Sequence, residues 1–93
     1  MTDIKTEEWW VYVITSTYGK TYVGCAKNID KRIEQHNGKR VGGAKSTRGG
    51  RPWVLSRTLG PFTSRGEAQK VEFAVKSLKG QARVSTQLQL KLT

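Results

Sequence analysis

The stretch "TYGKTYVGCAKNIDKRIEQH" (residues 17–36) decides the fold, because it holds a turn, a short strand and the start of a helix. The segment before it, "WWVYVIT" (9–15), is aromatic and β-branched, as is typical of a strand. "TYVGC" (21–25) predicts a second strand, and the turn "STYGK" between them predicts a β-hairpin. The question is whether these residues are only structural or also form an active site.

A helix is predicted directly after the hairpin. Asn28 is a good N-cap, so the helix should begin near Ile29. Its residues Ile29, Arg32, Ile33 and His36 follow at i, i+3, i+4 and i+7, and therefore share one face.

The second half of the chain predicts a loop, a strand and a helix. Residues 37–51 form a glycine-rich basic loop without an acidic residue, and "PWVLSRTLG" (52–60) reads as a strand. Ser64 and Glu67 form a capping-box pattern that starts a second helix, for which Gly80 is a suitable C′ residue. Glu72 lies beside the apolar stripe of that helix, which consists of Ala68, Val71, Val75 and Leu78.

The element order β-β-α-β-α predicts an α+β domain, with a small three-stranded, mainly antiparallel sheet flanked by helices. Residues 1–8 are polar and acidic and are predicted to be a flexible tail, and residues 9–93 a single domain. The end of the chain is ambiguous, since "LQLKL" (88–92) alternates like a strand but also fits a helical turn.

The charge of the chain predicts an anionic partner. Seventeen Lys and Arg face seven Asp and Glu, which gives a formal net charge of +10. Nucleic acid is the commonest partner of such a body, and no helix combines a basic face with the strongly apolar face that a membrane surface requires. No apolar run is long enough to span a membrane, and no secretory signal is visible, so we expect an intracellular protein of the cytoplasm or nucleus.

Five residues stand out as candidates for catalysis. Taken singly, each has a structural explanation: Tyr12 and Tyr22 as strand residues, Arg32 as a solvated charge, and His36 as a helix-end residue. The fifth, Glu72, is an acid beside an apolar stripe in a domain with few acids. Together they supply what phosphodiester hydrolysis requires, namely an oxygen ligand for Mg²⁺, a cation for phosphate charge and a group that moves a proton.

The same segments resemble the GIY-YIG nuclease superfamily. "VYV" (11–13) and "YVG" (22–24) resemble its two signature tripeptides, and "KNIDKRIEQHN" (27–37) resembles the helix that follows them. "EAQKVEFAVK" (67–76) resembles the later helix with the metal-binding glutamate, and "AKSTRGGRPWVL" (44–55) is similar to small stand-alone members. The resemblance implies a DNA endonuclease that uses one divalent metal ion, Mg²⁺ or Mn²⁺.

The resemblance also assigns roles to residues. It implies Tyr12, Tyr22, Arg32 and His36 as catalytic residues, and Glu72 as the single metal ligand. The sequence departs from the family pattern at the first signature, which reads Trp10-Val11-Tyr12, and at Cys25 and Ala26, where many members have Lys and then Thr or Ser. Lys27 or Lys20 would then have to supply the missing cation.

We expect the DNA backbone to contact a further set of residues: Gly24, Lys27, Lys39, Arg40, Lys45, Arg48 and Arg51. No base-reading motif is present, so recognition of DNA structure or strandedness, such as a flap, a branched junction or a single strand, is expected. Trp9, Trp10 and Trp53 are candidates for stacking on an unpaired base, or for the core.

A targeting protein partner is compatible with this function, and the oligomeric state stays open. The alternative function is a nucleic-acid-binding module that keeps the fold and cleaves weakly or not at all.

Overall fold

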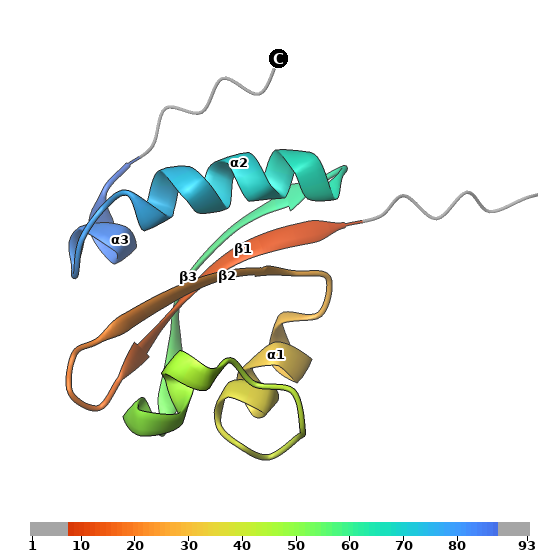
Figure 1. Ribbon diagram of the computed structural model, residues 1–93. Helices are drawn as coiled ribbons and strands as arrows, with labels where there is room; N and C mark the ends of the chain where they lie inside the picture. Colours follow the sequence, from red (N-terminus) through yellow and green to blue (C-terminus); the bar gives the residue numbers. More distant parts are fainter. Residues whose placement is uncertain (1–7, 88–93) are drawn as a thin grey trace, which may run out of the picture.

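The computed structural model describes residues 8–87, which form a three-stranded sheet with helices on both of its faces (Figure 1). The strand order is β2-β1-β3, and β1 pairs antiparallel with both neighbours, so the predicted α+β class is confirmed. The elements are β1 (Trp9–Ser16), β2 (Thr21–Ala26), α1 (Ile29–His36), the 3₁₀ helix η1 (Lys45–Gly50), β3 (Trp53–Phe62), α2 (Arg65–Lys76) and α3 (Ala82–Ser85).

The predicted hairpin is present, and both backbone hydrogen bonds and the Ser16 side chain close its turn. The hydroxyl of Ser16 accepts hydrogen bonds from the backbone N–H groups of Tyr18 (3.2 Å) and Lys20 (3.0 Å). Gly19 has φ +82°, a conformation that favours glycine. The turn therefore fixes the register in which Tyr12 faces Gly24 across the two strands.

Both predicted helix N-caps are confirmed. The side chain of Asn28 accepts from Lys31 N, and that of Ser64 accepts from Glu67 N. The predicted end of the second helix is wrong, because α2 stops at Lys76 and not before Gly80. The guanidinium of Arg83 takes up the carbonyls released there, donating to Lys76 O (3.0 Å) and Leu78 O (2.8 Å).

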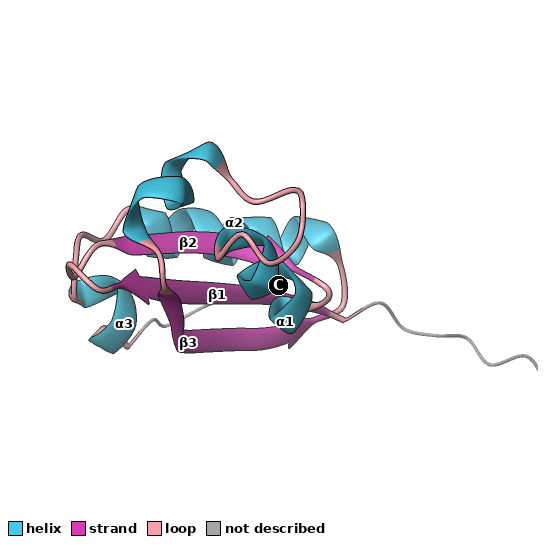
Figure 2. Cartoon of the chain, turned by 90° about the horizontal axis from the view of Figure 1, so that it is seen from below, coloured by secondary structure: helices cyan, strands magenta, loops and turns pink. Residues whose placement is uncertain are grey.

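The two faces of the sheet bury different cores. Since side chains alternate along a strand, Val11 and Val13 of β1 face α2, whereas Tyr12 and Ile14 face α1. The α2-side core is apolar and consists of Val11, Val13, Val23, Phe62, Ala68, Val71 and Val75. The α1-side core consists of Tyr12, Ile14, Ala26 and Trp53, with Tyr22, Ile29 and Ile33 packed against it. Figure 2 shows β1 in the middle of the sheet with α1 in front.

Two further differences from the sequence-based expectation concern the second half of the chain. The third strand was predicted over 52–60 and extends to Phe62. The basic loop contains the ordered helix η1 (Lys45–Gly50). The candidate strand 88–92 lies outside the described residues, as does most of the predicted tail. Within the described residues, no helix is long and apolar enough to cross a membrane.

Candidate active site

Three of the predicted catalytic residues meet on the α1 side of the sheet. The hydroxyl of Tyr12 lies 2.7 Å from Nε2 of His36, which comes from the last turn of α1. Tyr22 packs against the same imidazole, with the two ring centroids 4.7 Å apart. The two tyrosine rings are 6.5 Å apart, so the hairpin and α1 bring all three side chains together.

A residue that the sequence did not single out completes this cluster. Oγ1 of Thr47, in η1, lies 3.0 Å from Nδ1 of His36 and donates to the carbonyl of Ala44 at 2.7 Å. Thr47 and His36 are both fully buried. The indole N–H of Trp53 donates to the carbonyl of Thr47 (2.7 Å), which ties η1 to the sheet. The one available signal was that Thr47 is the single β-branched residue among Lys45–Gly50, where the other residues are small or basic.

Burial keeps both members of the Tyr12–His36 pair uncharged. Desolvation raises the pKa of Tyr12 to about 12, and the nearby Arg32 guanidinium only partly offsets it. Desolvation, together with the positive charge of Arg32, lowers the pKa of His36 to about 4. At neutral pH the proton therefore stays on the phenol, and the imidazole is a neutral acceptor beside it.

Gly24 makes room for the Tyr12 phenol. A Cβ atom at position 24 would overlap the Tyr12 hydroxyl and its ring. Gly24 is buried and pairs with Tyr12 across the hairpin. The space that a side chain would occupy is thus filled by the catalytic candidate itself. A contact of the Gly24 backbone with phosphate stays a prediction.

Arg32 joins α1 to the basic loop. Its Nη1 donates to Oε1 of Gln35 (2.7 Å) and to the carbonyl of Gly42 (2.9 Å). Its charge influences the pKa of both Tyr12 and His36, so the guanidinium lies close to the pair. Arg32 and His36 were predicted to share a helix face, and they lie close together; their catalytic roles stay a prediction.

Glu72 comes from α2, which packs on the opposite face of the sheet from α1 (Figure 1). Its side chain is 20% exposed and pairs with Nζ of Lys76 at 3.2 Å. The negative charge of Glu72 contributes to the raised pKa of Tyr12, and to that of Cys25 after burial. This contribution is the smallest of those that act on Tyr12, and the two side chains come from different layers of the fold.

The residues around Glu72 would suit only a loosely held metal ion. Residues 8–87 contain no group of three or more His, Cys, Asp or Glu side chains that could enclose an ion. A single carboxylate is a hard oxygen donor, which suits Mg²⁺ with most of its ligands supplied by water and substrate, and does not suit a closed structural zinc site.

The predicted DNA-binding residues fall into separate groups. Arg40, Arg48 and Arg51 line one hollow of about 420 Å³ beside α1, together with Gln35 and the backbone around Gly42. Two of these arginines also have partners within the chain. Nε of Arg40 pairs with Glu34 (2.8 Å), and Nε of Arg51 donates to the carbonyl of His36 (2.8 Å). Lys39 and Lys45 are exposed outside this hollow.

A second hollow, of about 430 Å³, lies over the end of β2. Arg32, Cys25 and Lys27 line it together. Lys20 is in the turn at the other end of the hairpin. Of the two lysines considered as replacements for the cation missing at position 25, Lys27 is therefore the one that shares a surface with Arg32.

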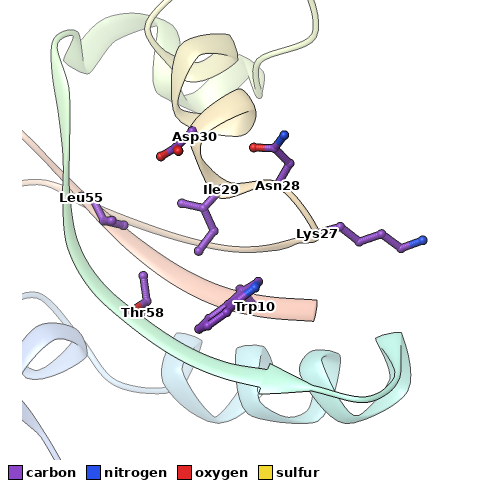
Figure 3. Close-up of a pocket in the computed structure, with 7 residues that line it drawn as sticks. All are labelled: Trp10, Lys27, Asn28, Ile29, Asp30, Leu55 and Thr58. Carbon is purple, nitrogen blue, oxygen red and sulfur yellow. The ribbon is translucent and has the colours of Figure 1, made fainter. Parts of the chain in front are cut away.

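The three tryptophans differ in their surroundings. Trp53 is buried in the α1-side core, and the ring of Trp9 lies beneath Lys27 (5.2 Å from Nζ to the centroid) and Arg65. Trp10 lines a third hollow, of about 460 Å³, which the start of α1 and strand β3 enclose. Figure 3 shows Ile29 pointing toward this hollow from α1, with Leu55 and Thr58 of β3 opposite. Trp9 lines the second hollow, so Trp9 and Trp10 both border open space and stay candidates for stacking, whereas Trp53 is buried.

Comparison with known proteins decides the family. The model of the GIY-YIG catalytic domain matches residues 8–85. The chain belongs to the GIY-YIG family. The match covers both strands of the hairpin, α1, the basic loop and α2, so the resemblance seen in the sequence is confirmed.

Two kinds of relatives share this GIY-YIG domain. A UPF0213 protein of Nitratidesulfovibrio vulgaris is 44% identical over 70 residues, which is 75% of this chain and 61% of that protein. A UPF0213 protein of Halobacterium salinarum is 38% identical over 68 residues, or 73% of this chain and 84% of that protein. The structure-specific endonuclease subunit slx1 of Schizosaccharomyces pombe is 39% identical over 59 residues, 63% of this chain but only 22% of that protein. The chain therefore matches less than two thirds of the first and third of these relatives.

Proposed function

We propose that this GIY-YIG protein is a divalent-metal-dependent endonuclease that hydrolyses phosphodiester bonds in DNA. The observation that carries the proposal is the buried Tyr12–His36 pair with Arg32 beside it, in a chain with a net charge of +10. Membership of the family supports it, as does the slx1 relative, which is named a structure-specific endonuclease subunit.

The side chains have distinct tasks in this reaction. Hydrolysis joins a water oxygen to phosphorus and breaks the bond to the leaving oxygen, which takes up a proton. The attacking water must lose a proton, and Tyr12 is the group that receives it, with Tyr22 packed beside the same imidazole to hold the pair. Arg32 stabilises the charge that develops on the phosphate, and its Nη1 also donates within the chain to Gln35 and Gly42.

Glu72 is the residue that would hold the metal ion. One Mg²⁺ or Mn²⁺ per site would supply Lewis-acid stabilisation of phosphate charge when bound. Lys76 competes for the same carboxylate in the structure, since the two groups pair at 3.2 Å. Tight metal binding should therefore depend on the DNA phosphate, which adds ligands that the protein lacks.

The DNA backbone would follow the basic surfaces on both sides of α1. Arg40, Arg48 and Arg51 line one hollow, and Lys27 lies with Arg32 on the other. Contacts of this kind give affinity without sequence information, so the logarithm of the affinity should fall steeply with the logarithm of the salt concentration.

We infer that the enzyme prefers DNA with an unpaired or branched strand. The supporting observation is Trp10, whose ring lines an open hollow next to Lys27, where an unpaired base has room to stack. A protein partner that delivers the enzyme to its substrate is compatible with the slx1 relative being named a subunit.

Two observations favour the alternative, a binding module with little cleavage. Position 25 holds a half-buried thiol in place of the lysine found in many members, and Glu72 is already paired with Lys76. This alternative retains DNA binding but predicts no metal-dependent product.

Cleavage assays with matched glutamate variants test the proposal. Wild-type protein is incubated with duplex, flap, junction and single-stranded DNA, with Mg²⁺ or with EDTA. We expect cutting with Mg²⁺ only, fastest on substrates with unpaired strands. Glu72→Gln should bind DNA without cutting it, whereas Glu67→Gln, on the same helix, should cut normally. DNA binding with no cleavage by the wild-type protein under any of these conditions would favour the binding module.

A further inference from the structure

The hydrogen bonds around His36 have a fixed direction. The carbonyl of Ala44 can only accept, and it takes the hydroxyl proton of Thr47 at 2.7 Å. A hydroxyl has one proton, so Thr47 Oγ1 must be the acceptor in its 3.0 Å contact with His36 Nδ1. Nδ1 therefore carries the hydrogen of the neutral imidazole. Nε2 is left as an acceptor, and it faces the Tyr12 hydroxyl at 2.7 Å.

We propose that Thr47 is a positioning residue that holds His36 in the Nδ1–H tautomer, so that Nε2 is kept ready for the Tyr12 proton. The hydrogen bonds run from Tyr12 through His36 and Thr47 to the Ala44 carbonyl. Their direction is fixed by this carbonyl, because it can accept a hydrogen bond but cannot donate one. The catalytic part of this inference rests on the proposed nuclease function, whereas the tautomer does not.

Burial and the packing of η1 hold the Tyr12–His36–Thr47 hydrogen bonds in this arrangement. Tyr12, His36 and Thr47 are each 1% exposed or less, so water does not compete for their hydrogen bonds. Helix η1, which carries Thr47, is held by the bond from Trp53 Nε1 to the Thr47 carbonyl (2.7 Å). Next to it, Asn37 and Trp53 exchange two hydrogen bonds, of 3.0 and 2.6 Å. The hydroxyl is thus presented to His36 by a rigid support.

The fixed tautomer gives the phenol proton a destination. When Tyr12 accepts a proton from the attacking water, its own proton passes to Nε2, and the water is left as hydroxide. The imidazolium that results has two N–H groups, one directed at Tyr12 and one at Thr47. In the other tautomer Nε2 would already carry a hydrogen, and the phenol would have no acceptor within this cluster. An analogous role is known for groups that orient a catalytic histidine in other hydrolases.

Nuclear magnetic resonance of the imidazole nitrogens tests the proposal on the full chain, because His36 is its only histidine. Thr47→Val removes the hydroxyl at nearly constant shape, and Thr47→Ser keeps it. Thr17→Val is the control, because it makes the same Thr-to-Val substitution at an exposed turn residue. We expect the Nδ1–H tautomer in wild type, Thr47→Ser and Thr17→Val, and loss of its dominance in Thr47→Val. The Nε2–H tautomer in the wild-type protein, or an unchanged tautomer in Thr47→Val, would overturn the proposal. If Thr47→Val does not fold, the wild-type and Thr47→Ser spectra still decide.

Single-turnover cleavage gives the second measurement. Thr47→Val should cut roughly 10- to 100-fold more slowly than wild type, an effect typical of residues that orient a catalytic group, while Thr47→Ser recovers most of the rate. DNA affinity should be unchanged in both variants. If the protein does not cut DNA at all, the proposed function fails, whereas the tautomer measurement still tests the role of Thr47.

Discussion

On its α2 side, strand β1 buries Val11 and Val13 against an apolar helix face, whereas on its α1 side it buries Tyr12 against His36 and Thr47. Strand β1, which is eight residues long, contributes buried side chains to both cores. One contains no polar side chain among its buried members, and the other contains a directed series of hydrogen bonds. The difference lies in alternate residues of one strand, which contribute to an apolar core on one face and to the proposed catalytic cluster on the other.

The largest expected effect separates Arg32 from Lys39, two basic residues that a charge count treats alike. Arg32 lies beside the Tyr12–His36 pair, and Lys39 is exposed in the loop after α1. Arg32→Ala should lower single-turnover cleavage by roughly 10²- to 10³-fold, because it stabilises the reacting phosphate. Lys39→Ala should weaken DNA binding by about 1 kcal/mol or less and cut normally at saturating DNA. If both variants lost the same amount of cleavage rate, Arg32 would be only one more residue that contacts the DNA backbone.

Gly24 tests how tightly the reactive core is packed. A methyl group at this position would overlap the Tyr12 hydroxyl, so Gly24→Ala must displace the phenol from His36. We expect destabilisation by about 1–3 kcal/mol in chemical denaturation, and a clear loss of cleavage by the folded fraction. Gly49→Ala is the matched control, since a Cβ there would meet nothing within 4 Å. A Gly24→Ala variant that keeps full activity would show that Tyr12 does not need its observed position.

Val71 tests the α2 side of the sheet. It is fully buried in the α2-side core and has no contact role in the proposed chemistry. Val71→Ala should reduce the free energy of unfolding by about 1–3 kcal/mol, because it leaves a cavity. Its single-turnover rate, measured well below the melting temperature, should stay at the wild-type value. A rate lost without a loss of stability would mean that the two faces are not separate in function.

The sequence predicted the hairpin, both helix starts and the common face of Arg32 and His36, since these depend on local patterns. Asn28 and Ser64 cap their helices through contacts three residues away, which spacing alone reveals. Thr47 was missed because its partner, His36, is eleven residues distant and the contact requires the loop to fold back onto α1. The end of α2 was missed for the same reason, because Arg83 returns to the helix end from the following segment.

Lowering the pH should reduce the free energy of unfolding, because His36 is buried in its neutral form. Its pKa is about 4 in the folded chain, against an ordinary value of 6.5, so only the unfolded state gains a proton as the pH falls below 6.5. Stability should therefore decrease between pH 6.5 and 5, by on the order of 1 kcal/mol, in a range above the ordinary titration of carboxyl groups. Unfolding at several pH values measures it. Since the chain has one histidine, a His36→Gln variant should lose this dependence. If the stability of His36→Gln depends on pH as strongly as that of the wild type, the effect comes from other groups.

The central claim is that Tyr12 is a reactive group and not only a core residue, and a pair of identical substitutions tests it most directly. Tyr12→Phe removes the hydroxyl that contacts His36, and Tyr18→Phe removes one from a side chain that is 79% exposed in the hairpin turn. The measurement is single-turnover cleavage of a flap substrate with Mg²⁺ and excess enzyme. We predict that Tyr12→Phe binds this DNA but cuts it roughly 10²- to 10⁴-fold more slowly, while Tyr18→Phe matches the wild type. Cleavage by folded Tyr12→Phe at the wild-type rate would contradict the account.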